Sequence, residues 1–200
     1  MTRWRVAVLV ALPALLMVAA SSVVAWLSDV APADLTQDPA TLLGYPSYLG
    51  LFSHLGIVLW AAAAAIAVFA WAVLRSSDRE RARYFAFAGL LSTLFAFDDL
   101  LLLHEEVLPH GVGIDEFVVM GAYGLLSLAF LIRHYARIVV EGPALLLAAV
   151  VSLGISVLLD LWDPSDVNVL VEDGFKLLGI GCWLGHFGRA AARLLSLRPT

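Results

Sequence analysis

The chain is 200 residues long, 62% of its residues are hydrophobic and only 14% are charged, which gives a mean hydropathy of +0.91. Soluble proteins carry about 25% charged residues, because a polar surface must cover the core on every side. This composition therefore excludes an ordinary soluble domain and predicts an all-α, polytopic integral membrane protein. The net charge of −5 is less informative than the way the charges are distributed along the chain.

Cysteine content and short motifs narrow the possible functions. Cys182 is the only cysteine, so an internal disulfide and a CxxC redox or zinc motif are both excluded. The chain has no GxGxxG, P-loop or HExxH motif, and no run of Lys and Arg of the kind that binds nucleic acid. We therefore expect no nucleic-acid partner.

Six apolar segments are each long enough to cross a hydrocarbon core of about 30 Å as a helix. They cover residues 6–27, 49–74, 84–108, 116–132, 143–161 and 167–187. Pro109 is expected to close the third segment, Asp115 to cap the fourth, and the pairs Asp38-Pro39 and Asp163-Pro164 to mark turns or helix starts. The sequence thus predicts one six-helix transmembrane domain over residues 1–200, with a short helix from Pro39 in the longest connection.

The first segment also has features of a cleaved signal peptide. Arg3 and Arg5 precede the apolar stretch, and small residues occur at 19–21. The stretch nevertheless continues through Trp26 and Leu27, which is longer than the apolar region of most signal peptides. We therefore expect a retained span; cleavage would leave five spans in the same orientation.

Basic and acidic residues alternate between the two ends of these segments. All arginines lie at or near the segment ends that would face one and the same side of the membrane: Arg3, Arg5, Arg75, Arg79, Arg81, Arg83, Arg133, Arg137, Arg189, Arg193 and Arg198. The opposite ends carry Asp29, Asp34, Asp38, Glu105, Glu106, Asp115, Asp160, Asp163 and Asp166, with no Lys or Arg. Basic residues are retained on the cytoplasmic side, so the pattern predicts a multi-pass cell-membrane protein with both termini cytoplasmic.

Several ionisable residues fall inside the predicted spans, all towards the outer side. At 1.5 Å per residue, Asp98, Asp99 and Lys176 lie about 15 Å below the outer helix ends. By the same measure Glu172 and His54 lie roughly 8 to 10 Å down. Charges at such depth are costly, which makes each a candidate functional residue.

Helical periodicity indicates how these residues face one another. Glu172, Lys176, Gly179 and Trp183 form one stripe of the last segment, where Glu172 and Lys176 have the spacing of an ion pair. In a continuous helix His104 would point about 120° away from Asp98. We expect the third and sixth segments to pack antiparallel, with Lys176 near Asp98 or Asp99 and Glu172 nearer Glu105.

Carboxylate and imidazole side chains from several helices could hold a divalent metal such as Zn, Mn or Fe. The candidate ligands are His54, Asp98, Asp99, His104, Glu105, Glu116 and Glu172. The chain lacks the paired Glu-x-x-His motifs of soluble di-iron bundles, and it lacks clustered histidines. The metal site is therefore one interpretation of the cluster among several.

Two other interpretations remain open. Intramembrane carboxylates with a lysine and histidines also serve proton or cation transport, but the inner halves of the spans show only His186 and Cys182 as polar residues. Alternatively, Lys176 neutralises Asp98 or Asp99 in a purely structural ion network.

The leading hypothesis is a small, metal-dependent membrane-embedded enzyme with a carboxylate-rich pocket that opens outwards and accepts a lipid-like or other small ligand. The candidate catalytic residues are Asp98, Asp99, Glu105, Glu172 and Lys176, of which Lys176 would stabilise anionic charge and the carboxylates would act as metal ligands or general base. The alternatives are a cation or proton carrier, and an accessory subunit whose acidic rim binds a partner. An oligomer is compatible with each of these hypotheses.

Overall fold

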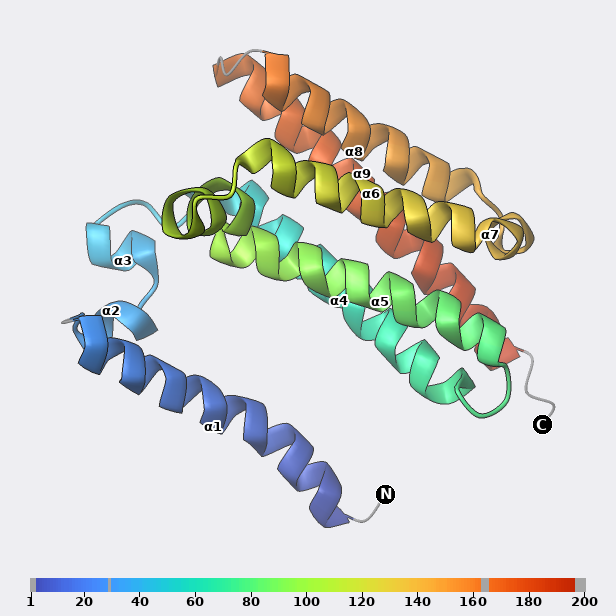
Figure 1. Cartoon of the computed structure of the whole chain (residues 1–200), viewed down its shortest axis with the longest axis horizontal. Helices are drawn as coiled ribbons and strands as arrows, with labels where there is room; N and C mark the ends of the chain where they lie inside the picture. The colour runs from blue at the N-terminus through green and yellow to red at the C-terminus, as the bar shows by residue number, and fades with distance from the viewer. Residues whose placement is uncertain (1–2, 29, 163–165, 197–200) are drawn as a thin grey trace. The chain divides into compact units, whose positions relative to one another are not determined.

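A computed structural model describes residues 3–28, 30–162 and 166–196, which form helices joined by turns, with no strand among them (Figure 1). The elements are α1 (Arg3–Ser28), α2 (Pro32–Thr36), α3 (Pro39–Leu43), α4 (Leu51–Leu74), α5 (Arg79–Leu101), η1 (Leu103–Val112), α6 (Glu116–Arg133), α7 (Tyr135–Glu141), α8 (Ala144–Trp162) and α9 (Asp166–Ser196). The predicted all-α class is confirmed. The chain divides into two compact units, residues 1–49 and 50–200, and each is described by itself.

The first unit contains the long helix α1 and the short helices α2 and α3. A short helix from Pro39 was expected, and α3 starts there because the carboxylate of Asp38 accepts hydrogen bonds from the Ala40 and Thr41 amides, at 2.8 and 3.4 Å. Gly44 ends α3 in the left-handed conformation, at a φ of 68°.

Among the described residues, length and apolarity alone qualify four helical segments as candidate membrane spans: Ala11–Ser28, Leu51–Leu74, Arg79–Leu101 and Glu116–Arg133. A fifth candidate is the pair formed by α7 and α8, which is bent by 117° at Gly142 and Pro143. The last helix, α9, is not among these candidates, and it carries Glu172, Asp173 and Lys176. The predicted membrane class thus agrees with four or five apolar helices of sufficient length.

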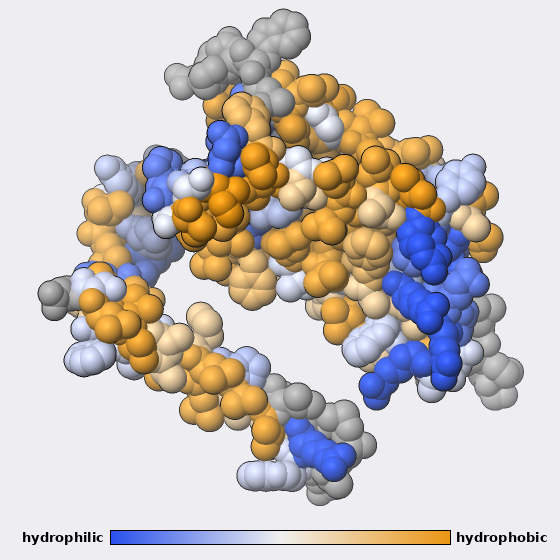
Figure 2. All heavy atoms as spheres, viewed as in Figure 1, coloured by the Kyte–Doolittle hydropathy of each residue, from blue (hydrophilic) through white to orange (hydrophobic). Residues whose placement is uncertain are grey.

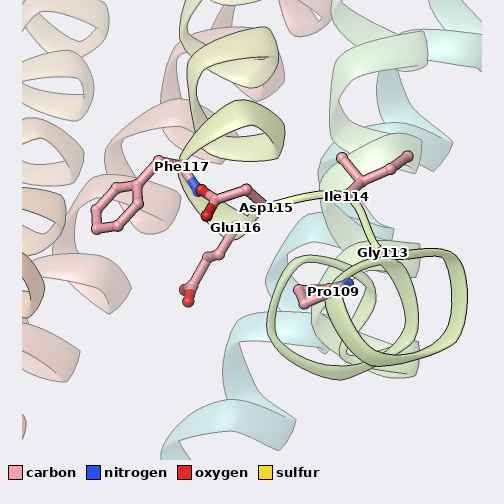
Figure 3. Close-up of a pocket in the computed structure, with 6 residues that line it drawn as sticks. All are labelled: Pro109, Gly113, Ile114, Asp115, Glu116 and Phe117. Carbon is pink, nitrogen blue, oxygen red and sulfur yellow. The ribbon is translucent and has the colours of Figure 1, made fainter.

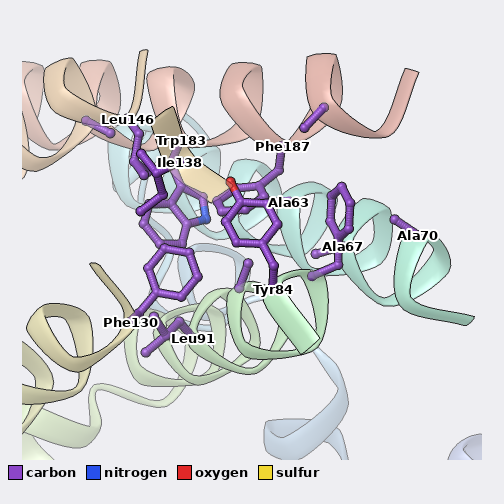
Figure 4. Packing of buried hydrophobic residues seen from close by; sticks show 14 of the residues in the cluster. Ala63, Ala67, Ala70, Tyr84, Leu91, Phe130, Ile138, Leu146, Trp183 and Phe187 are labelled. Atoms are coloured by element: carbon purple, nitrogen blue, oxygen red, sulfur yellow. The ribbon is translucent and has the colours of Figure 1, made fainter. Parts of the chain in front are cut away.

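The core of the second unit is built from small residues on α4 and large aromatic residues on α5, α6 and α9 (Figure 4). Ala63, Ala67 and Ala70 lie at helical spacing on one face of α4, where small side chains allow close backbone approach. The spaces that they leave are filled by a cluster of rings: Trp60, Tyr84, Phe85, Phe130, Trp183 and Phe187. This packing fixes α4 against both α5 and α9.

Two glycines allow the closest helix contacts in this unit. A Cβ on Gly89 of α5 would lie 3.1 Å from Val68 Cγ2 of α4. A Cβ on Gly179 of α9 would lie 2.6 Å from Leu153 Cγ of α8 and 3.1 Å from the Leu153 backbone nitrogen. Because these contacts leave no room for a methyl group, glycine is required where α8 and α9 cross.

The third predicted span, residues 84–108, is wrong as a single helix. The α-helix α5 ends at Leu101, and Leu102 takes a left-handed backbone conformation with a φ of 51°. The chain continues as the π-helix η1, so Pro109 lies inside a helix and does not close the third segment. The other predicted spans match α1, α4, α6, α8 and α9 to within a few residues, except that α9 continues to Ser196. The Asp163-Pro164 pair lies outside the described residues.

Candidate functional site

Hydrophilic residues gather at the two ends of the α4–α9 unit, with hydrophobic residues between them (Figure 2). One end, called the acidic end, is where α5 ends and where η1, Asp98, Asp99 and His104 lie. The other, called the arginine end, is where α5 begins and where Arg81, Glu141 and Arg193 meet. Figure 1 shows these ends on opposite sides of the unit. The acidic end contains most of the predicted site.

Asp98 accepts hydrogen bonds from two different elements and is only 4% exposed. Its Oδ2 lies 2.6 Å from Nδ1 of His104, and its Oδ1 accepts a 3.1 Å hydrogen bond from the His104 amide. The hydroxyl of Tyr123, on α6, donates to Oδ1 at 2.8 Å. Asp98 therefore fixes the His104 ring and ties α5 and η1 to α6.

The break at Leu102 explains why His104 reaches Asp98. The orientation expected from a continuous helix was wrong, because the left-handed residue turns the chain back over the end of α5. The side-chain hydrogen bond to Asp98 raises the pKa of His104, and burial opposes this effect. Its Nε2 lies 3.4 Å from Oε1 of Glu105, whose side chain is half exposed.

Asp99 forms an ion pair with Lys176 across the bundle. Lys176 Nζ of α9 lies 2.8 Å from Asp99 Oδ1, as expected from the similar depth of the two residues. Asp99 Oδ2 is buried and has no hydrogen-bond partner among the described residues. The predicted Glu172–Lys176 ion pair is not among the ion pairs of the described residues, because Lys176 turns towards α5 instead.

The other predicted site residues lie away from the Asp98–His104 and Asp99–Lys176 contacts. His54 is exposed near the start of α4, and Glu172 makes no hydrogen bond or ion pair with any described residue. Glu116 lines an open depression of about 370 Å³ together with Pro109, Gly113, Ile114, Asp115 and Phe117 (Figure 3). Asp115 caps α6 as predicted, since its Oδ1 accepts a 2.9 Å hydrogen bond from the Phe117 amide.

The predicted metal ligands do not assemble into a coordination site. Within the described ranges no group of three or more His, Cys, Asp or Glu side chains is arranged to hold a metal ion. The closest pair, Asp98 and His104, directs its oxygen and nitrogen atoms at each other, and the second nitrogen of His104 faces Glu105 at 3.4 Å. The donor geometry therefore does not support the metal interpretation of His54, Asp98, Asp99, His104, Glu105, Glu116 and Glu172.

The arginine end holds a second polar cluster that sequence reasoning missed. Glu141 is 3% exposed and binds the guanidinium groups of Arg81 at 2.9 Å and Arg193 at 3.4 Å. Arg189 donates to the backbone oxygens of Glu141 and Gly142 at 3.1 and 3.2 Å, so three arginines hold the bend between α7 and α8. The available signal was that Glu141 is an isolated acidic residue shortly after Arg133 and Arg137.

Two buried hydrogen bonds continue along the core between the two ends. The Tyr84 hydroxyl bonds His186, which is fully buried, and Trp183 Nε1 donates to the Ser92 hydroxyl at 2.9 Å. Each of these contacts joins α5 to α9, as does Asp99–Lys176, and together they show that the two helices run antiparallel as predicted. His186, one of the two polar residues noted in the inner halves of the spans, lies in the core beside Tyr84 and Phe187.

A family model described as "Domain of unknown function (DUF8692)" matches residues 7–190. The chain belongs to this family. The matched region includes Asp98, Asp99, His104 and Lys176 of the acidic end, and Arg81, Glu141 and Arg189 of the arginine end, while Arg193 lies just beyond it. Neither a curated protein nor a solved structure matches the chain.

Proposed function

We propose that this chain is a six-span cell-membrane protein whose acidic end faces outwards and performs general acid–base chemistry on a lipid-like ligand. The observation that carries the proposal is the partly buried contact between Asp98 and His104, 2.6 Å long and supported by Tyr123. A carboxylate that holds Nδ1–H of an imidazole directs the other nitrogen, Nε2, to accept a proton, and here a ligand would replace the half-exposed Glu105 carboxylate that lies 3.4 Å from Nε2. This is the arrangement by which a histidine becomes a general base.

Each neighbouring residue then has a role in this chemistry. Asp98 positions His104 and stabilises its protonated form, and Tyr123 holds Asp98 in place. His104 Nε2 takes a proton from a water or hydroxyl group of the ligand. Lys176 stabilises negative charge that develops nearby, while Glu105 and Glu172 interact with the ligand or with cations at the rim. Because the predicted metal ligands do not converge, no step is assigned to a metal.

The proposed membrane topology favours a lipid-like ligand. The helices α4, α5 and α6 and the bent pair of α7 and α8 supply apolar lengths for crossing, and α9 runs antiparallel to α5 beside them. With α1 this makes six spans, and the arginines near one end favour the cytoplasm for that end. The acidic end then opens at the level of the outer leaflet, where lipid head groups and acyl chains are accessible.

The test compares two histidine variants of the purified protein in nanodiscs that contain a mixture of glycerophospholipids and sphingolipids. Lipid composition is followed over time by mass spectrometry. We expect His104→Gln to abolish any time-dependent conversion and His110→Gln, at an exposed position of the same helix η1, to leave it unchanged. Since the pKa of His104 is raised from its ordinary value of 6.5, the rate should increase with pH through a midpoint above 6.5. Failure of every lipid to change with the wild-type protein would reject the enzyme.

A second candidate function, ion or proton transport, is favoured by the polar contacts along the core. The pairs Asp99–Lys176, Ser92–Trp183 and Tyr84–His186 place hydrogen-bonding groups from one end of the bundle to the other. Aromatic rings fill the space between them, so we expect no flux of protons or small cations in liposomes. A flux that disappears in Asp99→Asn would establish transport and reject the one-sided site.

A further inference from the structure

The arginine end carries more positive charge than its own carboxylates neutralise. Its acidic residues are Asp78, Glu80 and Glu141, of which Glu141 is held by Arg81 and Arg193. Eight arginines of the α4–α9 unit lie at this end: Arg75, Arg79, Arg81, Arg83, Arg133, Arg137, Arg189 and Arg193. The eight positive charges exceed the three negative charges by five. An anion that is not part of the chain is therefore attracted to this end.

Three of these arginines are exposed and have no partner that would neutralise them. The side chains of Arg79, Arg83 and Arg133 form no hydrogen bond or ion pair with any residue that the structure describes. Arg137 is half-buried, and its Nη2 lies 3.9 Å from Glu80 Oε1, which is longer than a hydrogen bond. A guanidinium group presents five N–H donors in a planar fork that fits a phosphate group. The exposed arginines can therefore donate to such an anion.

Two of the exposed arginines flank one junction between α5 and α6. The rings of Phe87 on α5 and His134 at the end of α6 have centroids 6.0 Å apart, so the two helices meet there. Arg83 lies one turn before Phe87, about 40° from it around the helix, and Arg133 directly precedes His134. Figure 2 shows a continuous hydrophilic area over the beginning of α5 and the end of α6. Guanidinium groups from two helices thus border the same place.

Exposed apolar side chains lie beside these arginines. Figure 1 shows α7 nearly end-on while α6 and α8 run across the view, and the bend between α7 and α8 is 117°. With α8 as a span, α7 therefore runs closer to the plane of the membrane than to its normal. It exposes Tyr135, Val139 and Val140, and Ile132 in the last turn of α6 is exposed as well. A surface that combines apolar and basic side chains in this way suits the boundary between acyl chains and head groups.

We propose that the arginine end binds an anionic phospholipid, whose phosphate group contacts Arg83 and Arg133 and whose acyl chains lie along Ile132 and Tyr135. Arginines favour the cytoplasmic side of the membrane, and the cytoplasmic leaflet is the one that is rich in anionic lipids. A soluble anion would use the arginines but not the exposed apolar side chains, so the combination favours a lipid. The inference goes beyond the proposed function, because it concerns the opposite end of the bundle and does not depend on Asp98 or His104.

The test measures binding of phosphatidylglycerol and phosphatidylcholine, with identical acyl chains, to the purified full chain by native mass spectrometry. We expect wild type to prefer phosphatidylglycerol. Arg83→Gln and Arg133→Gln should each weaken its binding about fivefold, equivalent to the ~1 kcal/mol that an arginine contributes at an anionic membrane surface. Because both side chains are exposed and unpaired among the described residues, the variants should keep the wild-type melting temperature. Phosphatidylcholine binding should not change.

The matched control is Arg75→Gln, which removes the same charge from the same end of the unit. Arg75 follows α4, and its guanidinium lies 5.8 Å from the centroid of the Trp71 ring. At physiological salt its loss should change phosphatidylglycerol binding less than about twofold, because a charge that does not contact the lipid is screened. An equal loss in Arg75→Gln and Arg83→Gln would show a diffuse attraction and overturn the site.

Two further outcomes would contradict the lipid. Equal binding of phosphatidylglycerol and phosphatidylcholine by wild type would overturn the proposal without the use of any variant. Displacement of phosphatidylglycerol by millimolar inorganic phosphate, at constant ionic strength, would show that a free phosphate is sufficient and that the apolar side chains of α7 do not contribute. Retention of the lipid under these conditions supports the proposed site.

Discussion

Lys176 is the residue on which the electrostatic stability of the acidic end depends. Its partner Asp99 is almost fully buried, so Lys176→Met leaves a carboxylate without its cation. We expect a loss of about 1–3 kcal/mol in the free energy of unfolding, less than for a fully buried pair because the Lys176 side chain is 31% exposed. Thermal unfolding in detergent, followed by tryptophan fluorescence, measures the loss.

Two further variants distinguish an ion pair from a packing effect. Lys176→Met combined with Asp99→Asn should recover much of the lost stability, because no buried charge is left unpaired. Glu172→Gln, one turn earlier on α9 and without an ion pair among the described residues, should change the melting temperature little. An unchanged melting temperature for Lys176→Met alone would show that the Asp99–Lys176 contact does not stabilise the protein.

At the residue scale, the sequence predicts a contact correctly when it follows from the depth of two residues below the helix ends. The prediction fails where the backbone departs from a regular helix. Asp99 and Lys176 were expected to meet because counting residues from the helix ends gives them the same depth. His104 could not be placed in this way, since its contact with Asp98 depends on the left-handed conformation of Leu102. A leucine gives no signal for that conformation, which is more common for glycine or asparagine.

At the element scale, Gly179 sets the distance between α8 and α9. A methyl group at this position would lie 2.6 Å from Leu153 Cγ and 3.1 Å from a backbone nitrogen, so the two helices must move apart. We expect Gly179→Ala to lower the free energy of unfolding by about 1–3 kcal/mol. Gly181→Ala on the same helix is the matched control, because its added Cβ has no atom within 4 Å. It should be neutral, or stabilising by up to about 1 kcal/mol through higher helix propensity. Equal unfolding temperatures for the two variants would contradict the close crossing.

Helix positions were predictable from apolar length, but their ends and bends were not. The segments 49–74, 116–132 and 143–161 lie within a few residues of α4, α6 and α8, because membrane thickness sets a minimum length for an apolar helix. The bend between α7 and α8 depends on Glu141 and three arginines. An apolarity pattern assigns these residues to a solvated loop, since it carries no information about which charges pair with each other. The buried cluster at the arginine end was missed for that reason.

At the scale of the whole molecule, the segregation of charge specifies an orientation that labelling can test. The arginines of α5 and α7 cluster with Arg189 and Arg193 at one end, and the carboxylates of η1 lie at the other. Arginine is retained on the cytoplasmic side during insertion, so the η1 end should be outside the cell. This orientation also determines which leaflet the Asp98–His104 pair can reach.

Single cysteines introduced in a Cys182→Ala background would establish the orientation in whole cells. Thr36→Cys on α2 and His110→Cys on η1 are at exposed positions and should react with a membrane-impermeant maleimide added outside. Arg79→Cys and Val139→Cys, also exposed, should react only after the membrane is permeabilised. Labelling of 79 and 139 from outside, with 36 and 110 protected, would reverse the topology and place the acidic end in the cytoplasm. Labelling of 110 together with 139 from outside would instead mean that α6 and α7 do not cross the membrane between them, which would contradict the six-span arrangement.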